Sequence, residues 1–257
     1  MTPRLSHRIG FILIGGMLMA SCAPPGVVVQ RQVTGAETNC YLLYDPATHE
    51  AALVDVGGEI GELLHTVQEQ GLRVRYVLAT HGHTDHVLGI PAAKDRFPQA
   101  LVCMHEHGYA DAQTLGDWIQ EHVPEETLEE WLQDPEFKKL TEFDASTLGA
   151  PDIFLTEGDE LELGGFAIRV LHCPGHSRGG LCYSVDGALF SGDVLFRGSV
   201  GRVDGQNASR EQQVASVRRL YAEFPDETIV YTGHGEATTI GYERANNERV
   251  SEIAVNL

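Results

Sequence analysis

The sequence is short of positive charge. Lys and Arg together number 18 against 37 Asp and Glu, which gives a formal net charge of −19. A surface this acidic repels a phosphate backbone, so nucleic-acid binding and nuclease function are disfavoured. Apolar residues make up 42% of the 257-residue chain, which is too many for a disordered protein. We expect one large folded unit with a substantial core.

The sequence lacks an apolar run long enough for a membrane-spanning helix. Its N-terminal run, residues 9–20, has twelve uncharged residues and follows Arg4 and Arg8. Twelve residues are too few for a bilayer of about 30 Å, so we expect a cleaved signal peptide over residues 1–21. Met19-Ala20-Ser21-Cys22 resembles the bacterial lipoprotein box, in which Cys22 is acylated. We expect an exported bacterial protein, periplasmic or anchored by a lipid on Cys22; an ordinary secretory signal is the alternative.

Cysteine is scarce, with five in the chain. Apart from Cys22, they are Cys40, Cys103, Cys173 and Cys182, and no two form a CxxC pair. A structural zinc knuckle is therefore not expected. Export would permit disulfides, but the spacing does not choose among the three possible connectivities. We expect four small core residues.

Strand and helix patterns alternate from residue 27 onward. Short β-rich runs and apolar residues at helical spacing predict strands at 27–33, 39–44, 51–56, 74–79 and 100–104, with helices near 60–70 and 90–97. Later runs predict strands at 160–163, 166–171, 181–185, 188–190 and 229–231, a helix opened by Ser209 and a last helix at 242–253. This order predicts an α/β domain over residues 27–257, with two sheets packed face to face and helices outside.

Residues 106–150 interrupt this order with an acidic, helix-prone stretch that holds both tryptophans, Trp118 and Trp131. Their apolar residues recur at three- and four-residue steps. We expect a helical insertion on the body of the domain. It could cap a site or serve only as a packing element.

The most informative segment is Thr80-His81-Gly82-His83-Thr84-Asp85-His86. It follows a predicted strand and precedes a predicted helix, so it forms a loop at a strand end. Residues two apart in an extended backbone point to the same side, so His81 and His83 can hold one ion. The turn into the helix aims Asp85 and His86 elsewhere, toward a second ion.

Three further candidates each follow a predicted strand: His176 in Pro174-Gly175-His176-Ser177, Asp193 in Ser191-Gly192-Asp193, and His234 in Gly233-His234-Gly235. Each motif alone is a common turn. Together with the first segment they supply five imidazoles and two carboxylates, which suit zinc, iron or manganese.

The order HGHTDH, PGHS, SGD and GHG resembles the metallo-β-lactamase fold superfamily over about residues 27–240. The resemblance implies an αββα four-layer sandwich, with two mixed sheets, helices outside and a metal site at one edge. It also implies two divalent ions, zinc by expectation and iron or manganese as alternatives. The implied first-ion ligands are His81, His83 and His176; the implied second-ion ligands are Asp85, His86 and His234; and Asp193 bridges both.

The function implied by this resemblance is hydrolysis by a metal-bound hydroxide, with Asp85 and Asp193 as the catalytic carboxylates. An aspartate at the bridging position, here Asp193, resembles the thioesterase and phosphodiesterase branches of the superfamily. True β-lactamases generally lack an aspartate there. Thr38-Asn39-Cys40-Tyr41-Leu42, Asp55-Val56-Gly57-Gly58 and the segment 190–202 resemble short bacterial proteins similar to glyoxalase II. The expected substrate is a small acyl compound or thioester of the S-2-hydroxyacylglutathione kind.

Substrate contacts are less defined. Arg178 and Arg197 are candidates for binding a carboxylate, and Arg202 for binding one or for orienting its loop. Full-length glyoxalase II has a basic helical domain that grips glutathione, but only 23 residues follow His234 here. Glutathione dependence therefore stays open.

Three other functions stay open. An iron oxygenase of the persulfide dioxygenase type would use one ion at positions matching His81, His176 and Asp193. A lactonase would use the same cluster on a cyclic ester. A non-enzymatic, lipid-anchored binding module is disfavoured because all seven positions keep ligand-type residues.

Overall fold

Two six-stranded sheets form the centre of the structure, a computed structural model that describes residues 10–14, 17–21 and 26–254. Near the N-terminus, β1 (Gly10–Ile14) pairs with β2 (Met17–Ser21) as an antiparallel hairpin. Cys22, where the lipid is expected, lies outside the described residues.

The first large sheet has the order β3-β4-β5-β6-β7-β8. Its strands are β3 (Val28–Val33), β4 (Asn39–Tyr44), β5 (Glu50–Val54), β6 (Arg73–Leu78), β7 (Leu101–Met104) and β8 (Ile153–Phe154). The first three strands are antiparallel, and β5 to β8 are parallel. The sheet is therefore mixed, and the parallel strands all end at one edge.

The second large sheet has the order β14-β13-β12-β11-β10-β9. Its strands are β9 (Glu160–Leu163), β10 (Phe166–His172), β11 (Leu181–Val185), β12 (Ala188–Gly192), β13 (Ile229–Thr232) and β14 (Thr238–Thr239). β12 and β13 are parallel and the other neighbours antiparallel. Because β11 runs opposite to both β10 and β12, the carboxyl ends of β10, β12 and β13 share one edge.

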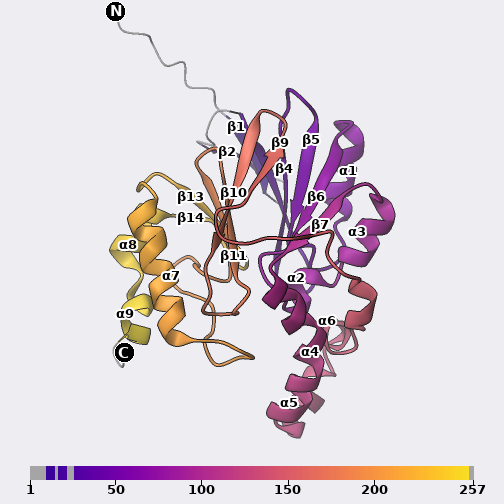
Figure 1. Cartoon of the computed structure of the whole chain (residues 1–257), viewed down its shortest axis with the longest axis vertical. Coiled ribbons are helices and arrows are strands. Elements are labelled where there is room, and N and C mark those ends of the chain that lie inside the picture. Colours follow the sequence, from indigo (N-terminus) through magenta and orange to yellow (C-terminus); the bar gives the residue numbers. More distant parts are fainter. Residues whose placement is uncertain (1–9, 15–16, 22–25, 255–257) are drawn as a thin grey trace, which may run out of the picture.

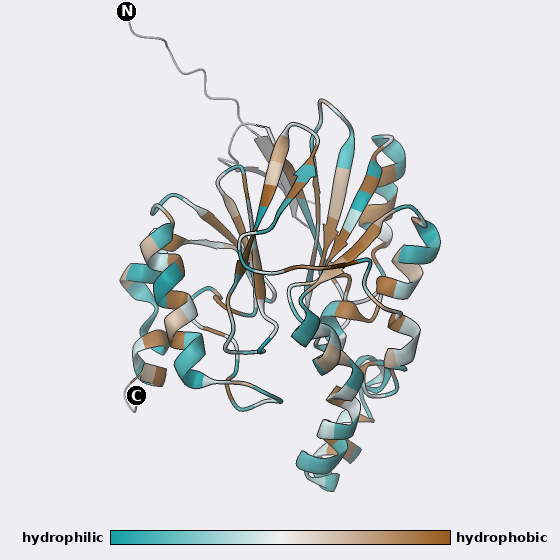
Figure 2. Ribbon diagram, viewed as in Figure 1, coloured by the Kyte–Doolittle hydropathy of each residue, from teal (hydrophilic) through white to brown (hydrophobic). Residues whose placement is uncertain are grey.

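Helices cover the outer face of each sheet (Figure 1). The first sheet carries α1 (Gly61–Glu69) and α3 (Ile90–Arg96), and the second carries α7 (Arg210–Glu223), α8 (Ile240–Asn246) and α9 (Glu248–Ala254). One apolar core lies between the sheets, and a further core lies under each helical layer. Figure 2 shows apolar residues concentrated on the strands and the covered helix faces. The four-layer αββα sandwich is confirmed.

The insertion projects from one end of the sandwich (Figure 1). It contains α4 (Glu106–His122), α5 (Glu125–Trp131), α6 (Pro135–Thr141) and a 3₁₀ turn at Ala145–Leu148. α4 buries four residues against the body, whereas α5 and α6 bury none. No helix among the described residues is long and apolar enough to cross a membrane.

The structure corrects the predicted elements in two places. The single helix expected at 242–253 is two helices that meet at Asn247, whose side chain bonds Glu243 and the carbonyl of Ser199 instead of continuing a helical face. The histidine-rich loop contains a short helix, α2 (Thr84–Val87), that the sequence reading did not place. The four cysteines beyond residue 26 are buried free thiols, which confirms that they are core residues.

Candidate metal centre

The seven expected ligands come from strand ends at one edge of the sandwich. His81 and His83 follow β6, and α2 carries Asp85 and His86. On the other sheet, His176, Asp193 and His234 follow β10, β12 and β13. Since these strands end at the same edge, side chains distant in sequence meet there.

Their donor atoms form three overlapping groups, each with its atoms within 4.8 Å of one another. The groups are His81, His83 and His176; His81, His86 and Asp193; and Asp85, His86 and His234. The first and third match the two ion sites that the resemblance implied. All seven residues are therefore brought together, and none lies apart.

Four of the histidines are oriented by an acceptor at Nδ1. His81 Nδ1 lies 3.1 Å from the Thr80 hydroxyl, and His86 Nδ1 lies 3.0 Å from an Asp55 oxygen. His176 Nδ1 lies 2.8 Å from the carbonyl of Arg202, and His234 Nδ1 lies 3.1 Å from that of Glu37. A proton held on Nδ1 leaves the Nε2 lone pair for a metal.

Asp193 lies between the two outer groups. Its Oδ1 is 3.4 Å from His86 Nε2, and its Oδ2 is 3.4 Å from His176 Nε2 and 3.6 Å from His234 Nε2. Gly233 makes room for this carboxylate, because a Cβ there would lie 2.1 Å from Oδ1. A carboxylate within reach of histidines from both outer groups has the position of a bridging ligand.

Two residues that hold the cluster, Asp55 and Thr38, have no role in the predicted ligand set. Asp55 is 1% exposed and accepts hydrogen bonds from the Thr80 backbone N–H at 2.7 Å and hydroxyl at 2.8 Å, besides facing His86. It adopts a left-handed φ of 55°, which costs free energy in a non-glycine residue. Thr38 donates its hydroxyl to Asp85 Oδ2 at 2.9 Å. Asp55 directly follows the buried strand β5, as the expected ligands follow theirs, and this position is the sequence signal that could have identified it.

Burial and neighbouring histidines lower the pKa of three imidazoles, to about 3 for His83 and about 4 for His176 and well below the usual value for His81. Burial also lowers the pKa of His86, but nearby carboxylates, Asp85 first, outweigh it and raise the pKa to about 10. At neutral pH the first group is therefore uncharged and ready to donate lone pairs.

The donor set fits a divalent metal. His81 Nε2 and Asp193 Oδ1 are buried and have no hydrogen-bond partner among the described residues. A buried polar atom without a partner is costly, and a bound cation would satisfy both. Imidazole nitrogens with carboxylate oxygens suit zinc, iron and manganese.

The three candidate arginines have partners within the chain. Arg197 stands 5.4 Å over the Tyr242 ring, and Arg202 pairs with Asp204 at 3.0 Å. Arg178 Nε donates to Asp111 at 2.8 Å. The backbone of Arg202, through its carbonyl, contacts His176. Arg178 and Arg202 therefore contribute contacts within the loops around the cluster.

Asp111 of α4 joins the insertion to both of those loops. It is 2% exposed, and its Oδ1 accepts hydrogen bonds from Arg178 and from Asn207 Nδ2, each at 2.8 Å. Arg178 lies two residues after His176, and Asn207 belongs to the loop whose Arg202 carbonyl faces His176. Asp111 therefore fixes the surroundings of one expected ligand from outside the cluster.

Gly82 lies where the histidine-rich loop meets the insertion. In the structure a Cβ at Gly82 would lie 1.9 Å from the carbonyl oxygen of Gly108 in α4. The glycine is needed because α4 packs directly on the histidine loop.

The chain is similar to known proteins. A model of the metallo-beta-lactamase superfamily matches residues 33–234. The chain is 32% identical over 225 residues to a Haemophilus influenzae protein named hydroxyacylglutathione hydrolase GloC, with 84% of this chain and 93% of that protein covered.

Two solved structures are also similar. One is BLEG-1, described as a B3 metallo-beta-lactamase, with a TM-score of 0.69, 30% identity and coverage of 86% of this chain and 98% of that one. The other is TTHA1623 in a di-iron-bound form, with a TM-score of 0.63, 31% identity and coverage of 84% and 98%.

Proposed function

Because the chain belongs to the metallo-beta-lactamase superfamily, we propose that it is a metal-dependent hydrolase of a thioester or related acyl substrate. The observation that carries the proposal is the position of Asp193 between two complete donor groups. His81, His83 and His176 would hold one ion, Asp85, His86 and His234 the other, and Asp193 would contact both. Two ions at such a site supply Lewis acidity and lower the pKa of a coordinated water.

The chain's own residues orient the reaction. Asp85 is fixed by the Thr38 hydroxyl, and its side chain keeps 22% exposure. Burial by itself would raise the pKa of Asp85. The neighbouring histidines, His86 and His234, together outweigh that effect and lower the pKa, so the carboxylate is ionised at neutral pH. Asp85 can therefore accept a hydrogen bond from a water that enters the cluster and can direct its attack.

A covalent nucleophile is not needed. Cys173 and Ser177 flank His176 in sequence, yet they are 1% and 2% exposed. Neither side chain is open to a substrate in this conformation, which supports direct hydrolysis over an acyl-enzyme route.

The similarity to a protein named hydroxyacylglutathione hydrolase supports a thioester substrate. The internal partners of Arg178, Arg197 and Arg202 favour recognition that does not depend on binding glutathione carboxylates. Because the chain is also similar to BLEG-1, which is described as a metallo-beta-lactamase, a β-lactam should be tested as a substrate as well.

The test is a turnover screen of the purified, metal-loaded protein. The panel contains S-lactoylglutathione, a neutral thioester, an acyl-homoserine lactone and a β-lactam, each assayed before and after chelation. We expect thioester hydrolysis that chelation removes and metal restores. If the metal-loaded protein turns over no member of the panel, it is not such a hydrolase.

An iron oxygenase is the second candidate. Two histidines and one carboxylate, as at His81, His176 and Asp193, form the donor set of mononuclear iron oxygenases, and TTHA1623 was obtained with two irons. The additional donor group at Asp85, His86 and His234 favours hydrolysis. Elemental analysis with an oxygen-uptake assay on a persulfide separates the two.

Export with lipidation at Cys22 is part of the proposal. It is supported by the short apolar run that follows two arginines and precedes Cys22. The intact mass of protein purified from the membrane fraction should correspond to residues 22–257 plus lipid, and Cys22→Ser should release the protein from that fraction. A non-lipidated mass with residues 1–21 retained would contradict it.

A further inference from the structure

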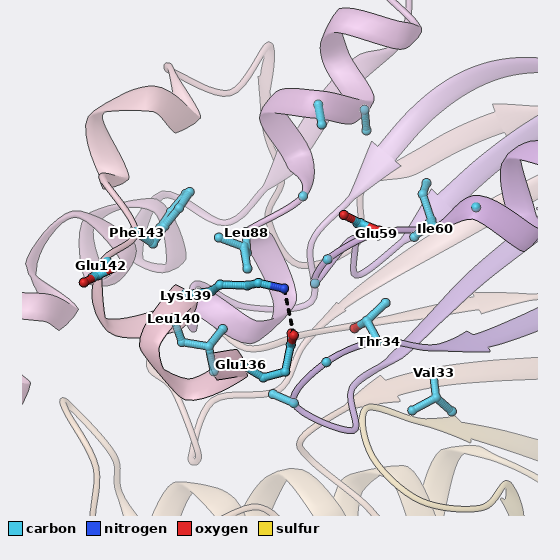
Figure 3. Close-up of a pocket in the computed structure, with 18 of the residues that line it drawn as sticks. Val33, Thr34, Glu59, Ile60, Leu88, Glu136, Lys139, Leu140, Glu142 and Phe143 are labelled. Carbon is cyan, nitrogen blue, oxygen red and sulfur yellow. Dashed lines mark hydrogen bonds and ion pairs between the residues drawn. The ribbon is translucent and has the colours of Figure 1, made fainter. Parts of the chain in front are cut away.

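A large groove lies between the insertion and the body of the domain (Figure 3). Its volume is about 1160 Å³, comparable to sites that take drug-sized ligands. Four segments line it: residues 33–36 after β3, residues 57–64 around the start of α1, residues 88–96 of the α2–α3 region, and residues 136–144 of the insertion.

Much of the groove's lining is apolar. It includes Ile60, Leu64, Leu88, Leu140 and Phe143, with small residues between them. Val33, another lining residue, is 49% exposed. An apolar concavity of this size favours a ligand with a hydrocarbon part.

The charged residues that line the groove are mostly acidic. Glu136 and Lys139, three residues apart on α6, pair with each other at 2.7 Å (Figure 3). The other charged residues are three carboxylates and one cation: Glu59, Glu142, Asp144 and Arg96. A ligand that carries a carboxylate at the end of its chain would meet like charge there.

One loop serves both the groove and the metal cluster. Thr34 lines the groove, and its hydroxyl and backbone N–H donate to the carbonyl of Thr38 at 3.3 and 2.9 Å. Thr38 in turn bonds Asp85, and the Glu37 carbonyl faces His234. The groove is therefore connected to the expected reaction centre through Thr34 and Thr38, and its lining contains none of the seven expected ligands.

The insertion closes the outer wall of the groove. A Cβ at Gly35 would lie 1.9 Å from a Glu136 oxygen, so α6 approaches the loop closely at this point. α6 and α5 bury no residue of their own against the body. The insertion therefore adds a wall to the groove.

From these observations we infer that the groove binds the hydrocarbon chain of the acyl group of a neutral substrate, so that the enzyme prefers medium-length acyl thioesters to short or carboxylated ones. This inference rests on the proposed hydrolase function. It assigns the insertion a role in substrate selection.

The first test measures binding to the metal-loaded protein without hydrolysis. The probes are S-alkyl thioethers of N-acetylcysteamine with methyl, hexyl and decyl chains, titrated by calorimetry. Each buried methylene should raise the affinity about threefold to fourfold. A decyl chain that ends in a carboxylate should bind at least tenfold more weakly than the plain decyl chain. Affinity independent of chain length would overturn the inference.

Two variants locate the binding. Leu140→Asp places a charge among the apolar residues that line the groove, and Gly61→Leu fills the groove at a position where an added Cβ has nothing within 4 Å. Both should weaken decyl binding at least tenfold and flatten the chain-length dependence. Leu132→Asp, at a 45% exposed residue of the same insertion outside the groove, is the matched control and should bind as wild type. If the wild type and the three variants bound the decyl probe with equal affinity, the hydrocarbon chain would not bind in this groove.

Hydrolysis of acetyl, hexanoyl and decanoyl thioesters completes the test. KM should fall with chain length in the wild type and less in Leu140→Asp. If no thioester is hydrolysed but thioether binding responds to chain length and to Leu140→Asp, the groove is confirmed as a hydrocarbon-binding site and the hydrolase proposal fails. If thioesters are hydrolysed with a KM independent of chain length, the hydrolase holds and the groove assignment fails.

Discussion

The imidazole Nδ1 of His86 lies 3.0 Å from Oδ2 of Asp55, and both side chains are buried. Asp55 directly follows β5, whereas His86 lies in α2 beyond β6, so the contact joins the ends of two neighbouring strands of the first sheet. It fixes the ring orientation that turns Nε2 toward Asp193 and His234. Several consequences of this arrangement can be measured.

Asp55→Asn should weaken metal binding about 10- to 100-fold, the usual cost of losing a partner that orients a ligand. Asparagine tolerates the left-handed backbone at this position, so the fold should survive. Chelator competition measures the affinity, and circular dichroism checks the fold. Asp95→Asn, at an exposed carboxylate on α3, is the control. Wild-type affinity in Asp55→Asn would show that the His86 contact does not matter for the metal.

Asp193→Ala should abolish turnover while leaving the fold intact. Removing the carboxylate between the two donor groups removes one ligand from each, so the bound metal per chain should also fall. Inductively coupled plasma analysis counts the metal, and Asp204→Ala, at an exposed carboxylate near the same loop, should retain wild-type content. Full activity in Asp193→Ala would mean that the bridge is misassigned.

Asp111→Ala should destabilise the protein by about 1–3 kcal/mol, the range for a buried hydrogen-bonding group whose partners are left behind. Arg178 keeps 40% side-chain exposure and can turn to water, so most of the cost falls on Asn207. Urea unfolding measures the change. Asp117→Ala on the exposed face of the same helix should stay within about 0.5 kcal/mol of wild type. If the two variants were equally stable, Asp111 would not stabilise the loops around the cluster.

Glu50 should make stability depend on pH. The Gly164 N–H, which donates to it at 2.9 Å, and the guanidinium of Arg75 lower the pKa of Glu50 against the opposing effect of burial. A carboxyl with a lower pKa in the folded state stabilises the fold above its unfolded pKa of about 4.3 and loses that contribution as the pH falls through the folded pKa.

At pH 7, Glu50→Gln should therefore be about 1 kcal/mol less stable than wild type, because Arg73 and Arg75 are more than one-third exposed and solvent screens them. The difference should shrink between about pH 5 and pH 3. Unfolding at a series of pH values measures it, and a constant difference over this range would contradict the assignment.

Local patterns predicted much of the architecture. Runs such as residues 39–44 and 181–185 and the capped helix after Ser209 match the observed strands and helix, because burial on both faces and N-capping leave signals within a few residues. The break at Asn247 and the two-residue strand β8 were not predictable, since they depend on partners far along the chain. The strand β14 pairs with nearby β13, and its two residues are too few to leave a pattern.

The sequence by itself determined which side chains could bind metal, because imidazole and carboxylate donors at strand ends are local and chemically specific. Only the tertiary structure decided which of them share an ion, how Asp55 and Thr38 orient them, and that Arg178 pairs with Asp111 of the insertion. Those outcomes depend on contacts between segments that are far apart in the chain, and local sequence patterns carry no information on such distances. The groove has the same origin, since four separate segments form its walls.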